Sequence, residues 1–184
     1  MNILVLNGSL DQREGSTPTK LSAYLKQHLE AQGATVSIFN LVESGIPLFD
    51  YTLQKIPNGV QVMLNLFRNA DAHIWLTPLY HGSMTGVMKN CLDWLELSSK
   101  EERPYLIDKL IGLICWADGG QAMQGINAMD AVAKSLRAWP VPFSVPIVRN
   151  ALFMAPDYQE ITQEYKNKIN LLTSIITSKR VVTI

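Results

Sequence analysis

Residues 2–9 spell NILVLNGS, a short apolar run that ends abruptly in turn-forming residues. The run lacks polar alternation, which is typical of a strand buried on both faces of a parallel sheet. A stretch of helical period follows, because Leu21, Leu25 and Leu29 recur at every fourth position. Gly33 suits the end of this helix. The chain is therefore expected to begin with a β-strand joined to an α-helix.

The same alternation of a short β-type run and a longer helical stretch recurs along the chain. The expected strands are 3–6, 35–40, 72–77, 110–116 and 143–148, with helical stripes at 21–29, 60–67, 87–95, 126–136 and 161–176 and a surface connection at 42–58. Pro146 inside the last strand indicates the edge of a sheet. Five βα units predict an α/β fold, a flavodoxin-like three-layer sandwich with a five-stranded parallel sheet of order 2-1-3-4-5. We expect residues 1–184 to form a single domain.

Composition restricts the class of function. Hydrophobic residues make up 47% of the 184 residues, which argues against disorder. Sixteen basic and sixteen acidic side chains cancel, so neither nucleic acid nor an anionic membrane is expected as the main partner. No signal peptide or membrane helix is predicted, and Cys91 and Cys115 lie in apolar runs, so we expect reduced, buried thiols in a cytoplasmic protein. The scattered His and Cys residues predict no metal site.

The predicted topology places ligand binding beyond the carboxyl ends of the strands, where the strand order reverses. That point lies between the first and third strands, so the loops of interest are 7–17 and 77–86, with 116–121 beside them. The first loop combines backbone amides, hydroxyls, glycines and one arginine at a helix N-terminus, which suits a phosphate dianion. Neither the P-loop nor the Rossmann glycine pattern is present. A plain turn between strand and helix is therefore an alternative for this loop.

The second loop, residues 77–86, has the composition of a surface for a planar ligand. Pro78 ends the strand, Tyr80 and His81 offer flat surfaces, and Gly82 lets the backbone come close to a ring. An isoalloxazine ring fits these requirements. The alternative is that Tyr80 simply covers the end of the sheet.

Residues 78–94, PLYHGSMTGVMKNCLDW, resemble a pattern of the NADPH-dependent FMN reductase family, Pro-x-Tyr-x-x-Ser/Gly-x-x-Gly-x-Leu/Met-Lys-Asn with a following Asp-Trp pair. The first loop is similar to the family's Gly-Ser-x-Arg-x-x-Ser through Gly8, Ser9, Arg13 and Ser16. It departs from that pattern because three residues separate Ser9 from Arg13, where the family usually has one. Residues 117–121 resemble the glycine-containing turn that borders the flavin.

This resemblance implies a protein that binds FMN and transfers hydride from NADPH or NADH to flavin N5, before the electrons pass to a small-molecule acceptor. No side chain is then expected to be catalytic, because the cofactor carries the chemistry. The implied cofactor-binding residues are Ser9, Arg13, Ser16 and Thr17 for the phosphate, Pro78, Leu79, Tyr80, His81, Gly82 and Ser83 for the ring, and Asp118, Gly119 and Gly120 for its border. The family also implies a homodimer or homotetramer.

Other functions fit the same loops. An NAD(P)H:quinone or azo-type reductase would keep its FMN, whereas a flavin reductase must release it, and sequence does not set that affinity. An electron-carrying flavodoxin without NAD(P)H turnover is a second alternative. The zero net charge and the absence of a threonine-rich phosphate loop argue against it. A non-catalytic flavin-binding module is a third.

Overall fold

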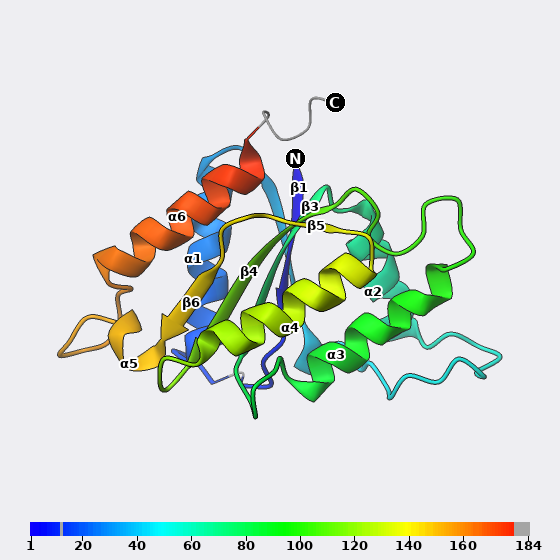
Figure 1. Cartoon of the computed structure of the whole chain (residues 1–184), viewed down its shortest axis with the longest axis horizontal. Helices are drawn as coiled ribbons and strands as arrows, with labels where there is room; N and C mark the ends of the chain where they lie inside the picture. The colour runs from blue at the N-terminus through cyan, green and yellow to red at the C-terminus, as the bar shows by residue number, and fades with distance from the viewer. Residues whose placement is uncertain (12, 179–184) are drawn as a thin grey trace.

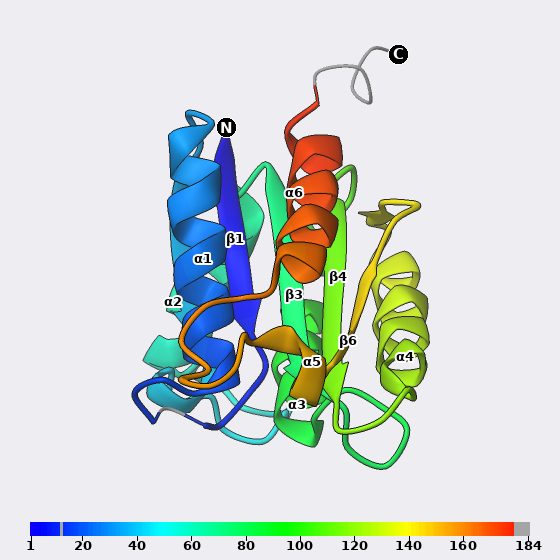
Figure 2. The same ribbon diagram turned by 90° about the vertical axis from the view of Figure 1, so that its left-hand side faces the viewer.

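A central parallel sheet lies between two layers of helices in the computed structural model, which describes residues 1–11 and 13–178 (Figures 1 and 2). The strands are β1 (Asn2–Asn7), β2 (Thr35–Asn40), β3 (Ala72–Pro78), β4 (Leu110–Ala117), β5 (Trp139–Pro140) and β6 (Val145–Val148). The α-helices are α1 (Thr17–Ala31), α2 (Asn58–Asn69), α3 (Gly86–Asp93), α4 (Ala122–Ser135), α5 (Arg149–Leu152) and α6 (Gln163–Thr177), with short 3-10 helices η1 (Leu41–Glu43) and η2 (Trp94–Ser98).

Two apolar cores hold these layers together. Helices α1 and α6 cover one face of the sheet, and α2, α3 and α4 cover the other (Figure 2). Strands β3 and β4 are buried along their whole length, which fits the continuous apolar sequence of β4 and the mainly apolar sequence of β3, where only His73 and Thr77 are polar. On α1, Leu21, Leu25 and Leu29 are fully buried, as their spacing predicts. Gly33 ends that helix in the left-handed conformation, with φ +84°.

The strand order is β2-β1-β3-β4 followed by β5 and β6, which confirms the predicted flavodoxin-like order. The fifth position differs in detail, because two short strands occupy it. Strand β5 pairs with the start of β4, and β6 pairs with its end. Prolines at 140, 142 and 146 account for the interruption, since proline has no N–H to donate to a ladder.

Other boundaries follow the sequence pattern with small shifts. Residues 45–57 form an irregular connection, and the stripe predicted at 87–95 is divided between α3 and η2. The four-residue helix α5 was not predicted, because it is too short to show a helical period. Within residues 1–11 and 13–178, no helix has the length and apolar character needed to cross a bilayer. Cys91 and Cys115 are buried free thiols, as expected.

Candidate active site

A cavity of about 110 Å³ lies at the carboxyl edge of the sheet, where loops from β1, β3, β4 and β6 meet. Six residues of its wall belong to the predicted cofactor-binding set, namely Ser9, Thr17, Pro78, Leu79, Tyr80 and Asp118. Five were not assigned to the cofactor from sequence, namely Asp11, Pro18, Trp116, Ala117 and Arg149. The three loops expected from the topology therefore share one cavity.

The first loop folds back on itself before α1 begins. The backbone N–H of Ser9 donates to the Asn7 side chain at 3.0 Å, and the Asp11 N–H donates to the Ser9 hydroxyl at 3.1 Å. Ser16 occupies the N-cap position, but its hydroxyl lies 2.9 Å from that of Thr19 and makes no capping bond to the described helix amides. The first turn of α1 therefore keeps N–H groups that can receive an anion. These donors fit the phosphate of FMN.

Arg13, which the family resemblance implied for the phosphate, is paired with a carboxylate of its own loop. Its guanidinium makes a two-bond pair with Asp11, in which Nε donates to one carboxylate oxygen at 2.9 Å and a terminal nitrogen donates to the other at 2.7 Å. The Arg13 side chain is 85% exposed, whereas that of Asp11 is 32% exposed. Hydrogen bonding from Arg13 lowers the pKa of Asp11 to about 2. Arg13 and Ser16 both lie next to the cavity wall formed by the described residues, not in it.

The second loop is a tight turn that projects Tyr80. The backbones of Tyr80 and Ser83 exchange two hydrogen bonds of 3.1 Å, with His81 and Gly82 between them at φ +48° and +82°. Glycine suits the second of these left-handed positions, and histidine is an uncommon occupant of the first. Of the predicted loop residues, His81, Gly82 and Ser83 stand at the tip, outside the described cavity wall.

Thr85 holds the first two loops together. Its hydroxyl donates to the Gly8 carbonyl at 2.6 Å and accepts from the Met88 N–H at 3.2 Å, which caps α3. A side chain at position 8 would collide with Met88, since a Cβ there would lie 2.6 Å from the Met88 sulfur. Gly8 is therefore required for the close approach of β1 to α3. Thr85 itself was not assigned a role from sequence.

The third loop closes the opposite side of the cavity. Asp118 lines it and forms an ion pair with Arg149, whose Nε lies 2.7 Å from the carboxylate. Gly119 and Gly120, both predicted to border a ring, lie beyond the described wall, and the space around Gly120 is open. Arg149 was not predicted as a site residue because it belongs to no motif. Its position directly after a strand, at the ligand-binding edge, is the signal that could have found it.

Residues 1–158 match the family described as NADPH-dependent FMN reductase. The chain belongs to the NADPH-dependent FMN reductase family. Over 140 residues it is 33% identical to the NADPH-dependent FMN reductase ArsH of Rhizobium meliloti, a match that covers 76% of this chain and 56% of that protein. The chain thus spans little more than half the length of this relative. Over 150 residues it is 31% identical to the FMN-dependent NADPH-azoreductase of Staphylococcus saprophyticus, covering 79% of this chain and 76% of that one.

Solved structures confirm the fold of this family member. The flavoenzyme NAD(P)H:(acceptor) oxidoreductase FerB from Paracoccus denitrificans superimposes with a TM-score of 0.71 at 20% identity, over 95% of this chain and 92% of that chain. The apo form of the NADH:FMN oxidoreductase EmoB gives a TM-score of 0.67 at 19% identity, over 95% and 87%.

Proposed function

We propose that this chain binds FMN in the cavity at the carboxyl edge of the sheet and acts as an NAD(P)H-dependent FMN reductase. One observation carries this proposal. A single cavity connects the uncapped N-terminus of α1, which suits a phosphate, with the wall of Pro78, Leu79 and Tyr80, which suits a flat ring. Family membership supports the same assignment.

Each loop then has a distinct task. Ser9, Thr17 and the first amides of α1 hold the phosphate, with Ser16 and Arg13 beside them. Residues 78–83 lie along the ring, and residues 118–120 border it. When bound, FMN supplies the chemistry, because it accepts hydride from NADPH or NADH at N5 and passes electrons on to an acceptor. The protein has to position the two reactants, and no side chain is required as an acid or base.

The acceptor is a small molecule. Reduced FMN can leave the protein and act as the electron carrier itself. A second candidate function is the reduction of an azo compound with retained FMN, which is supported by the 31% identity to the azoreductase of Staphylococcus saprophyticus. The affinity for FMN distinguishes these two functions.

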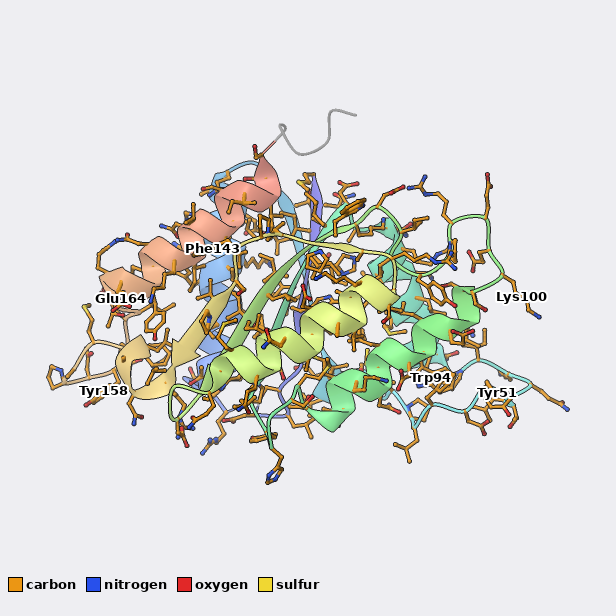
Figure 3. The ribbon with its side chains drawn as sticks, viewed as in Figure 1. Tyr51, Trp94, Lys100, Phe143, Tyr158 and Glu164 are labelled. Carbon is orange, nitrogen blue, oxygen red and sulfur yellow. The ribbon has the colours of Figure 1, made fainter. Side chains whose placement is uncertain are left out.

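We also propose that copies of the chain associate as a homodimer or homotetramer through the side that carries α3. Asn90 and Trp94 of this region hold the connection 45–57 in place by hydrogen bonds of 2.9 Å to the Pro47 carbonyl. This leaves Leu48 and Tyr51 83% and 77% exposed, and Figure 3 shows Tyr51 on that connection, at the same end of the molecule as Trp94. Leu48 also lines an apolar groove of about 330 Å³. A second copy would cover this surface.

Buried thiols support a cytoplasmic location.

A bleaching experiment tests the activity. The purified protein is mixed with equimolar FMN without oxygen, NADPH is added, and the visible flavin band is followed against a protein-free control. Rapid bleaching is expected. If neither NADPH nor NADH bleaches the flavin, the reductase proposal is wrong, and a flavodoxin-type electron carrier becomes the better description.

A further inference from the structure

The first loop carries a negative charge where a phosphate is proposed to bind. Asp11 lines the cavity and holds Arg13 through two hydrogen bonds of 2.9 and 2.7 Å. The carboxylate is the more enclosed partner of the pair, and the guanidinium lies toward solvent. Asp11 also belongs to the stretch between Ser9 and Arg13, which is two residues longer than the family pattern.

Asp11 lines the cavity, and its carboxylate is ionised. Hydrogen bonding from Arg13 is the main cause of the lowered pKa of Asp11, and the positive charge of Arg149, which lines the same cavity, lowers it slightly further. With a pKa of about 2, the carboxylate carries its charge at neutral pH.

The backbone of Asp11 is fixed between two residues of the proposed phosphate site. Its N–H donates to the Ser9 hydroxyl at 3.1 Å, and its carbonyl accepts from the Ser16 hydroxyl at 3.4 Å. Both serines therefore hold the backbone of Asp11 in place beside the proposed phosphate site. A phosphate at the N-terminus of α1 meets a like charge, and part of the positive charge of Arg13 is already offset by its two hydrogen bonds to Asp11.

From these contacts we infer that Asp11 competes with the flavin phosphate for Arg13. The Asp11 carboxylate pairs with Arg13 and repels the phosphate dianion. The affinity for FMN is therefore low, and FMN exchanges as a substrate. This inference rests on the proposed function, because it requires FMN in this cavity. It assigns the chain to the flavin reductases that release FMN, and not to the enzymes that retain it.

Comparison of FMN with riboflavin tests this role, because riboflavin has the same ring and no phosphate. Dissociation constants of both flavins are measured by fluorescence for the full chain and for Asp11→Asn. Loss of the competing charge is expected to tighten FMN binding about tenfold, the effect of one modest electrostatic contact, and to leave riboflavin binding within about twofold. Asp11→Ser serves as a second variant if the asparagine substitution impairs folding.

Glu14→Gln is the matched control, because Glu14 carries the same charge in the same loop but is exposed and lies outside the described cavity wall. Its FMN affinity should stay close to that of the unmodified chain. The inference is overturned if Asp11→Asn leaves FMN binding unchanged or weaker, if riboflavin tightens equally, or if Glu14→Gln has the same effect. If neither flavin binds the unmodified chain or the variants, the proposed function itself fails, and the inference fails with it.

Discussion

The hydroxyl of Thr85 donates to the carbonyl of Gly8 at 2.6 Å, although the two residues are 77 positions apart in the chain. The same hydroxyl caps α3 by accepting from Met88. One buried side chain therefore sets the distance between the loop proposed for the phosphate and the loop proposed for the ring.

Replacement of Thr85 by valine should destabilise the fold and weaken flavin binding. The variant keeps the side-chain shape but leaves the Gly8 carbonyl and the Met88 N–H without their partner, at a cost of about 2–4 kcal/mol. Urea unfolding measures this loss, and Thr85→Ser, which keeps the hydroxyl, should recover most of it. Equal stability of the valine and serine variants would show that the hydroxyl contributes nothing.

Ser16→Asp should abolish FMN binding while the chain remains folded. A carboxylate at the N-cap is compatible with a helix and even favourable for it, but it places a negative charge where the phosphate is proposed to bind. Circular dichroism checks the fold, and flavin fluorescence measures the affinity. Ser37→Asp, which adds the same charge at an exposed position on β2, is the control. Unchanged FMN affinity in Ser16→Asp would remove the phosphate assignment.

Stability should decrease on acidification from pH 7 to pH 5 because of His73. The ring is buried, its Nε2 lies 2.9 Å from the Phe67 carbonyl, and Nδ1 has no partner among the described residues. Burial lowers the pKa of His73 to about 3, whereas the unfolded chain has the ordinary value of about 6.5.

Acidification lowers the stability because the unfolded state binds the proton and the folded state does not. Below pH 6.5 His73 is protonated in the unfolded chain but stays neutral in the folded protein. The free energy of unfolding therefore falls by up to about 1.4 kcal/mol per pH unit below that pH. Between pH 7 and pH 5 the loss should be about 2 kcal/mol. Urea unfolding at a series of pH values measures it, and His73→Gln should flatten the profile over this range. An equally steep profile in that variant would assign the loss to other groups.

Both cysteines should be unreactive in the folded protein. Burial raises the pKa of Cys115 to about 12 and raises that of Cys91 further, so neither forms the nucleophilic thiolate near neutral pH. Titration with a coloured disulfide reagent should detect no thiol in the native protein and two after denaturation. Rapid labelling of one thiol without denaturant would indicate local opening around α3 or β4.

Much of the fold was predictable because its signals are strong and local. Continuous apolar runs identified β1 and β4, a mainly apolar run identified β3, and the leucines of α1 have a clear helical period. The interrupted fifth position was not predictable in detail. Pro146 indicated an edge, but the pairing of β5 and β6 with different parts of β4 depends on tertiary contacts that no local pattern specifies.

The candidate site divides in the same way. Topology and the motif at 78–94 identified the loops, and six predicted residues line one cavity. Arg149 was missed because it directly follows β6, a strand whose end carries no motif. The Asp11–Arg13 pair was missed because charge pairing within a loop depends on its exact course. The family resemblance implied that Arg13 binds the phosphate, whereas the structure shows its guanidinium paired with Asp11.

The interrupted sheet edge formed by β5 and β6 also disfavours the addition of strands from other chains. Exposed sheet edges can template the addition of strands from other chains, which leads to aggregation. Here the prolines at 140, 142 and 146 offer no N–H groups, and the gap between the two short strands breaks the row of acceptors. A foreign strand would find no continuous ladder to extend on this side. The prolines and the gap that made the fifth strand hard to predict thus also disfavour fibrous assembly.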